Sequence, residues 1–228
     1  MNVNTLREDH SCEHSSSERH PAAPPFPGIP PLLFDPDPSC PVPSAEECAA
    51  LWQRYAMLEH IKDHSRMVAE VATILAARAA EQGAAVDVPS VRAAALLHDL
   101  GKSYTIEHGG THGQVGASWV VRETKNPLLA QGVLHHMRWQ WDVNADEDRH
   151  LLCYCIIYAD KRVMHDRVVS TSERFADLLD RYGQTESARQ RIESSHRQGL
   201  EIEAALSRRL KVALNEHTFD CGRLVQRA

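Results

Sequence analysis

The chain has 228 residues, and its 25 Lys+Arg against 31 Asp+Glu give a formal net charge of −6. The longest uncharged apolar run, residues 151–159, is about half as long as a membrane-spanning helix needs. The acidic balance argues against a general nucleic-acid or anionic-membrane binder, although one local basic pocket would be hidden inside the net charge.

The first 43 residues are predicted to form a flexible, irregular arm. Ten of the twelve prolines lie between Pro21 and Pro43, and proline lacks the N–H that helices and sheets require. Charged residues and serines stand at the N-terminus where a secretory signal would be apolar, so we expect a cytoplasmic protein. The six cysteines form no CxxC pair, which is typical of reduced thiols in that compartment.

From residue 44 onward the pattern is helical. Ser44 and Glu47 have the spacing of a capping box, which predicts a helix running toward Met57. Further helices are expected over residues 59–82, 89–100, 111–121, 127–137, 147–164, from residue 170, and over 186–215. No convincing strand pair and no internal repeat is present. The sequence therefore predicts an all-α fold.

Two aspartates follow strongly apolar helical segments. Asp99 comes after the run Ala-Ala-Ala-Leu-Leu-His, and Asp160 comes after the apolar residues 151–159. A buried, unpaired carboxylate is costly, so each needs a cation, an arginine or a proton beside it. The sequence thus predicts positive charge at both positions.

Histidines suggest which cation this is, because seven of the fourteen lie between His60 and His136. His60 and His64 are four residues apart and share one helix face. Imidazole and carboxylate together suit divalent transition metals, and the donors are too many for one tetrahedral ion. We therefore expect two ions bridged by Asp99, with donors drawn from His60, His64, His98, His112, His135, His136 and Asp160.

The segment Ala-Ala-Leu-Leu-His-Asp-Leu-Gly-Lys (94–102), with His64 before it and Tyr-Ala-Asp-Lys (158–161) after it, resembles the HD superfamily of metal-dependent phosphohydrolases. The resemblance implies a helical bundle over residues 44–184 with a metal site in its core, and leaves residues 185–228 as a long C-terminal helix and tail. It also implies that His64, His98, Asp99 and Asp160 bind one metal ion.

The resemblance assigns further residues to this site. Members with two metals add histidines that match His112 and either His135 or His136, with His135 slightly favoured by the register. His60 stands where some members draw a ligand for a third ion. Catalysis is expected to involve Asp99 and Lys102, and the phosphate contacts to come from Lys102, Arg138, Lys161 and Arg162. Two divalent ions are expected, and the candidate metals are Fe, Mn, Ni, Co and Zn, with Mg as a further option.

The expected activity is hydrolysis of a phosphate ester or phosphoanhydride, on a nucleotide or a similar small molecule, by metal-activated water. Two alternatives stay open. The same ligand order occurs in di-iron oxygenases that resemble myo-inositol oxygenase, although Gly101-Lys102 favours the hydrolases. A non-catalytic nucleotide-binding module is the other alternative. The apolar stripe of the C-terminal helix leaves a homo-oligomer open as well.

Overall fold

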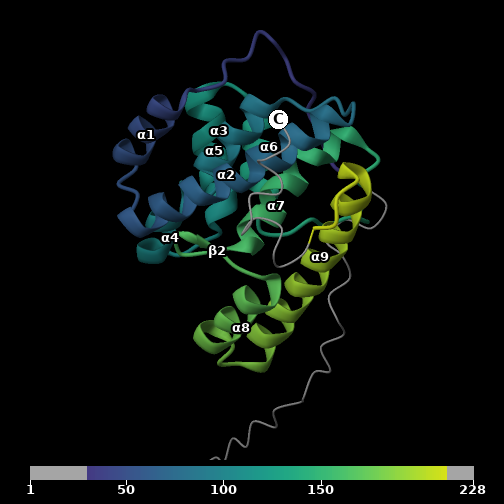
Figure 1. Cartoon of the computed structure of the whole chain (residues 1–228). Helices are drawn as coiled ribbons and strands as arrows, with labels where there is room; N and C mark the ends of the chain where they lie inside the picture. The colour runs from purple at the N-terminus through teal and green to yellow at the C-terminus, as the bar shows by residue number, and fades with distance from the viewer. Residues whose placement is uncertain (1–29, 215–228) are drawn as a thin grey trace, which may run out of the picture. The chain divides into compact units, whose positions relative to one another are not determined.

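The computed structural model describes residues 30–214, and the expectations for residues 1–29 and 215–228 lie outside the described part of the chain. Residues 31–214 belong to one unit, and its elements are almost all helical (Figure 1). The predicted all-α class is therefore confirmed. Within residues 30–214, no helix is both long and apolar enough to cross a membrane.

Most of the elements follow one another with short connections, and the longest connection is residues 136–147. In chain order they are α1 (Ala45–Arg54), α2 (Glu59–Glu81), α3 (Val88–Leu97), α4 (Lys102–His108), α5 (His112–Thr124), α6 (Pro127–His135), the 3-10 helix η1 (Asp148–His150), α7 (Leu151–Arg162), the strands β1 (Val163–Met164) and β2 (Arg167–Val168), α8 (Thr171–Tyr182) and α9 (Glu186–Leu210).

Capping residues set where several of these helices begin. The predicted capping box is present at α1, where the Ser44 side chain accepts from the N–H of Glu47, whose own carboxylate accepts from the N–H of Ser44. Asp87 and Ser170 cap α3 and α8 in a similar way. Asn126 caps α6 just before a proline in the first turn, where proline is tolerated.

Two features of the fold are missing from the sequence prediction. Helix α4 has seven residues and none of them is buried, so it carries no apolar stripe to reveal it. The antiparallel pair β1–β2 has only two residues in each strand, and its turn places His165 at φ 60° without a glycine. Both elements are too short for hydrophobic periodicity to detect.

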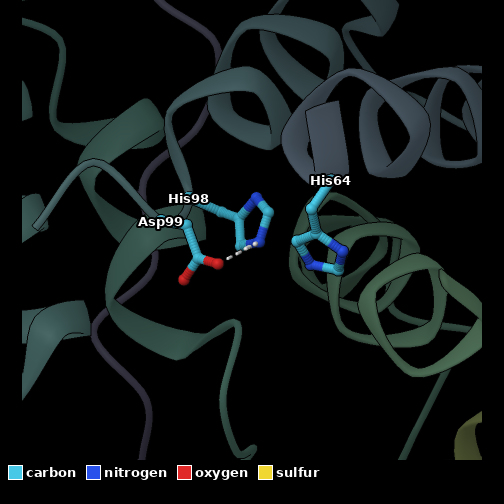
Figure 2. A group of neighbouring side chains, drawn as sticks. All are labelled: His64, His98 and Asp99. Carbon is cyan, nitrogen blue, oxygen red and sulfur yellow. Dashed lines mark ion pairs between the residues drawn. The ribbon is translucent and has the colours of Figure 1, made fainter. Parts of the chain in front are cut away.

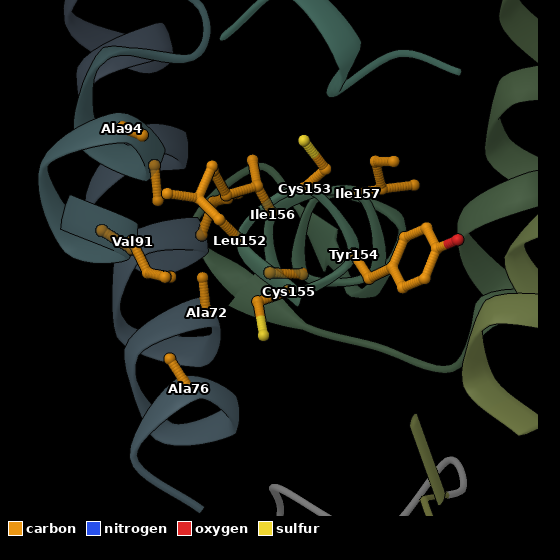
Figure 3. Close-up of a cluster of buried hydrophobic side chains, with 14 of the residues drawn as sticks. Ala72, Ala76, Val91, Ala94, Leu152, Cys153, Tyr154, Cys155, Ile156 and Ile157 are labelled. Atoms are coloured by element: carbon orange, nitrogen blue, oxygen red, sulfur yellow. The ribbon is translucent and has the colours of Figure 1, made fainter. Parts of the chain in front are cut away.

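Helix α7 forms the centre of the core. Every residue of the run 151–159 is buried, which explains why this helix is apolar on all faces. Figure 3 shows Leu152 and Ile156 of α7 among small side chains that include Ala72 of α2 and Ala94 of α3. Gly132 of α6 also packs here, because an added Cβ would lie 2.6 Å from Leu152 Cδ2. Small residues therefore let the neighbouring helices approach α7 closely.

Segments at both ends of the described chain pack against this bundle. Residues 30–43 contain no helix or strand, but the N–H of Phe34 donates to Gln131 Oε1 (2.7 Å) and Arg149 donates to the carbonyl of Leu33 (2.8 Å). The boundary of the unit therefore falls near Pro31. At the other end, α9 packs on both α7 and α8, and its buried residues include Ile202 and Leu206.

Candidate metal centre

The metal centre is built where α3 ends and the chain turns into α4. His98 and Asp99 follow α3 directly, and Gly101 precedes α4. A Cβ added to Gly101 would lie 2.6 Å from the carbonyl oxygen of His112 and 2.8 Å from the backbone nitrogen of Gly116. Only glycine therefore lets the start of α5 approach this turn, and that approach brings His112 beside Asp99.

A first group of donor atoms comes from His64, His98 and Asp99, which lie within 4.8 Å of one another. Figure 2 shows the three side chains facing a common space, with the His98–Asp99 pair drawn as a dashed line. His98 Nε2 lies 3.5 Å from Asp99 Oδ2. Asp160 of α7 joins this group, because its Oδ1 lies 3.0 Å from His64 Nε2 and 3.9 Å from His98 Nε2.

A second group consists of Asp99, His112 and His136. The Nε2 atoms of His112 and His136 lie 3.3 Å and 3.7 Å from Asp99 Oδ1, and 3.1 Å from each other. Asp99 therefore belongs to both groups and turns a different oxygen toward each. This is the arrangement that a carboxylate bridging two cations requires.

Backbone carbonyls orient two of the imidazoles. His98 Nδ1 lies 2.7 Å from the carbonyl oxygen of Ala95, and His136 Nδ1 lies 2.7 Å from that of Val133. A carbonyl only accepts, so each Nδ1 carries the hydrogen and each Nε2 faces the site. Burial lowers the pKa of His136 to about 3, so this side chain is neutral near pH 7 and its Nε2 offers a lone pair.

The electrostatics of the site favour positive charge. Burial alone would raise the pKa of the Asp99 carboxyl, but His98 and the ammonium of Lys102 hold it well below the usual range. Lys102 Nζ lies 2.6 Å from Asp99 Oδ2. Burial is likewise the largest effect on the pKa of His98 and lowers it, yet Asp99 and Asp160 together raise that pKa. His64 and His98 likewise hold the pKa of the Asp160 carboxyl well below its usual range, so two ionised carboxylates face the donor nitrogens.

Two buried atoms of the site show that a metal ion fits here. Asp99 Oδ1 and His98 Nε2 are both buried and have no hydrogen-bond partner in the described residues. Buried polar atoms are nearly always paired in native proteins, so two such atoms in one place need an explanation. A divalent cation in each group would satisfy them, and carboxylate oxygen with imidazole nitrogen is a donor set that such ions accept.

The structure places His136, not His135, at the centre. His135 is buried with Trp139 and Trp141, at ring-centroid distances of 5.6 and 5.4 Å. Successive residues of a helical turn point about 100° apart, so one ring faces Asp99 while the other faces the tryptophans. The register of the resemblance slightly favoured His135 as the ligand, but the structure brings His136 to the second donor group.

A cavity of about 250 Å³ lies beside the first group. His60, which is exposed and belongs to neither donor group, lines this cavity together with His64 and Lys102. Helix α8 contributes two further basic residues to the wall of this cavity, Arg174 and Arg181. Because His64 of the first donor group forms part of its wall, this space can hold a molecule next to that group.

Three predicted phosphate contacts lie elsewhere. The Arg162 side chain is fully buried, and its Nε donates to the carbonyl of Val169 while its Nη1 donates to the Tyr158 hydroxyl, both at 2.7 Å. It anchors the chain after the hairpin and cannot reach a substrate. Lys161 is also buried and donates to the carbonyl of Met137 (3.4 Å), and burial lowers its pKa. Arg138 is exposed and lines a different groove.

Sequence reasoning missed the two arginines of the cavity. The Nε atom of Arg174 is buried without a hydrogen-bond partner, and its Nη1 lies 3.4 Å from Asp177. Arg181 also pairs with Asp177, at 2.7 Å. The two arginines are seven positions apart in the sequence, which places them on one face of α8. That spacing is visible in the sequence, but only the docking of α8 shows which way the face points.

Comparisons with known proteins identify a family for this chain. The family model described as the HD domain matches residues 61–184. Ribonuclease Y of Opitutus terrae is 25% identical over 175 residues, which are 75% of this chain and 30% of that protein. Ribonuclease Y of Enterococcus faecalis is 32% identical over 78 residues, 34% of this chain and 14% of that protein.

An uncharacterized protein of Methanocaldococcus jannaschii is 45% identical over 65 residues, which are 28% of this chain and 37% of that protein. The chain thus spans well under two thirds of the length of these curated relatives. No solved structure matches it significantly.

Proposed function

The chain belongs to the HD domain family, and from this membership we propose that it is a metal-dependent phosphohydrolase that cleaves a phosphate ester or phosphoanhydride. The observation that carries the proposal is the position of Asp99, whose two oxygens face two separate donor groups. Hydrolysis by two bridged ions needs this geometry, because both the attacking water and the phosphoryl oxygens must be held.

We assign the ligands from the two groups. His64, His98, Asp99 and Asp160 hold one ion, and Asp99 with His112 and His136 holds the other. The donors suit Fe, Mn, Co, Ni or Zn, and Mg is a further option. When bound, such ions lower the pKa of a coordinated water and polarise the phosphoryl oxygens.

The protein's own cations act on the substrate from the cavity beside the first group. Lys102 lies on the wall of this cavity with its ammonium against Asp99, where it can balance the charge of a bound phosphate. Arg174 offers a buried guanidinium nitrogen that has no partner, and its planar fork suits phosphate oxygens. We assign both residues to binding and orienting the scissile phosphate.

The substrate class is proposed to be a nucleotide or a molecule built from nucleotides. The relatives named Ribonuclease Y point toward nucleic acid, so the expectation that nucleic-acid binding is excluded has no support. A net charge of −6 describes the whole chain, whereas the cavity wall is basic.

The test is hydrolysis after loading the full chain with Mn, Fe, Co, Ni, Zn or Mg. We expect release of nitrophenol from bis(p-nitrophenyl) phosphate or p-nitrophenyl phosphate with at least one of these metals. Asp99→Asn should lose bound metal and at least about 100-fold in activity, because changing even an outer partner of a metal ligand costs about 10–100-fold. Asp63→Asn is the matched control, since Asp63 is exposed and lines no part of this cavity.

Other outcomes would replace the proposal. Dioxygen consumption coupled to substrate loss in the ferrous-loaded protein, without phosphate-ester cleavage, would assign the chain to the oxygenases. Tight nucleotide binding without turnover under any of the six metals would assign it to the non-catalytic binding modules. An Asp99→Asn variant that keeps both metal and activity would show that Asp99 has only a structural role.

A further inference from the structure

A second groove continues from the cavity beside the metal centre. It has a volume of about 380 Å³, and its walls are α8, α9 and the residues that follow α6. Leu178 and Tyr182 line both the groove and the cavity, so the two spaces share a wall. The α9 side of the groove lies beyond residue 184, where the family match ends.

The charges along both spaces are basic. Among the described residues that line the cavity and the groove there is no aspartate or glutamate, while arginines line each of them. This is unusual for a chain of net charge −6. A larger cavity of about 540 Å³ elsewhere in the unit has Asp35, Asp87 and Asp148 in its wall. The cavity and the groove thus differ from this larger cavity, because no acidic residue lines them.

The arginines of the groove have charge available for a ligand. Arg191 donates to the hydroxyl of Ser187 at 2.6 Å, and this neutral partner leaves its charge uncompensated. Arg138 forms no ion pair with any described residue. On the cavity side the situation differs, because Asp177 pairs with Arg181 and Arg174. The arginines without an acidic partner thus line the groove, whereas those of the cavity are paired with Asp177.

An exposed aromatic ring stands between the two spaces. The Tyr182 side chain is 59% exposed, and the guanidinium of Arg181 lies 5.2 Å from the centre of its ring. Large exposed rings beside cations are the surfaces on which single-stranded bases stack. An inorganic polyanion would use the arginines but gain little from the ring.

We propose that the groove between α8 and α9 binds a second phosphate group of the substrate, and that the substrate is therefore a single-stranded oligonucleotide. This inference rests on the proposed function, which places the scissile phosphate at the metal centre. A base next to that phosphate stacks on Tyr182, and the following phosphate reaches Arg138 and Arg191. A mononucleotide occupies only the cavity.

Binding of fluorescein-labelled 2′-O-methyl phosphorothioate oligouridylate to the metal-loaded full chain tests this directly, with labelled uridine monophosphate as the comparison. By fluorescence anisotropy we expect the oligonucleotide to bind at least about tenfold more tightly. The double variant Arg138→Gln/Arg191→Gln should reduce the slope of log K against log salt by about 1.4, or about 0.7 for each lost cation. Tyr182→Ala should weaken binding about tenfold, and Tyr182→Phe should restore it.

The matched control is Arg197→Gln/Arg208→Gln. Both arginines are exposed on α9 and line neither space, so this variant loses the same charge without changing the groove. It should leave the salt slope at its original value. Equal slopes for the groove and control variants, or equal affinity for oligonucleotide and mononucleotide, would overturn the inference.

Cleavage of bis(p-nitrophenyl) phosphate separates the two proposals. If the metal-loaded chain cleaves this small diester but prefers no oligonucleotide, the groove inference fails and the proposed function stands. If the oligonucleotide binds with the expected salt slope but no diester is cleaved under any metal, the proposed function fails and the groove still binds nucleic acid.

Discussion

Replacing Gly101 with alanine places a methyl group between the turn that carries Asp99 and the start of α5. The added Cβ would lie 2.6 Å from the carbonyl oxygen of His112 and 2.8 Å from the nitrogen of Gly116, and both atoms belong to the backbone. Cβ atoms are essentially never closer than 3.0 Å to other heavy atoms, so α5 must retreat by about 0.4 Å. Overpacking of this kind costs about 1–3 kcal/mol of stability.

The retreat should weaken one metal group more than the other. Metal–ligand distances tolerate changes of only about 0.2 Å, and His112 moves with the backbone of α5. His64 and Asp160 lie on α2 and α7, which the methyl group does not touch. We therefore expect the second ion to bind about 10–100-fold more weakly while the first stays bound.

Metal analysis and isothermal titration of the purified variant measure this difference. Gly199→Ala on α9 is a suitable control, because the nearest atom to its added Cβ is Cδ of Lys161 at 3.0 Å, which belongs to a flexible side chain and not to the turn at Gly101. The control should keep both ions. A Gly101→Ala protein that binds two ions with unchanged affinity would refute the reasoning about the close approach of α5.

Two further predictions concern the core. Arg162→Met should lower the free energy of unfolding by about 1–3 kcal/mol, because it leaves the buried carbonyl of Val169 unpaired; urea unfolding at neutral pH measures this, and unchanged stability would contradict the anchoring role. Burial raises the pKa of the Cys153 and Cys155 thiols from 9.0 to about 12. The unfolded chain therefore ionises first, and each thiol should lower the unfolding free energy by about 1.4 kcal/mol per pH unit between pH 9 and 12. Cys155→Ala should remove the contribution of one thiol, about 1.4 kcal/mol per pH unit, from the slope of unfolding free energy against pH. An unchanged slope would argue against a buried neutral thiol.

Features that depend on residues close together in the sequence could be predicted from it. Ser44 and Glu47 cap α1 because a capping box is complete within four residues. The apolar runs before Asp99 and Asp160 predict burial with positive charge nearby, and Asp99 is buried while Asp160 is partly buried beside His64. The HD family assignment is confirmed by the match over residues 61–184.

Features that depend on helix rotation or docking could not be predicted. One residue of register separates His135 from His136, and only the packing of α6 shows which ring reaches Asp99. Arg162 carries the positive charge that a phosphate-binding residue needs, yet its guanidinium donates a hydrogen bond to the carbonyl of Val169 inside the core. Arg174 enters the cavity because α8 packs on α7 and α9. These contacts join segments far apart in the chain, so no local pattern encodes them.

Helix α9 also affects the order in which the bundle is completed during protein synthesis. Gln198 hydrogen-bonds both the N–H and the carbonyl of Trp139, and Glu203 accepts from the hydroxyl of Tyr158 on α7. A ribosome synthesises α9 after every residue of the two donor groups, so the nascent chain presents α7 with one side uncovered until α9 emerges. Coverage of this side of α7 is thus a late event in the synthesis of the chain. Expression of a fragment that stops at residue 184 would leave that apolar side open to aggregation.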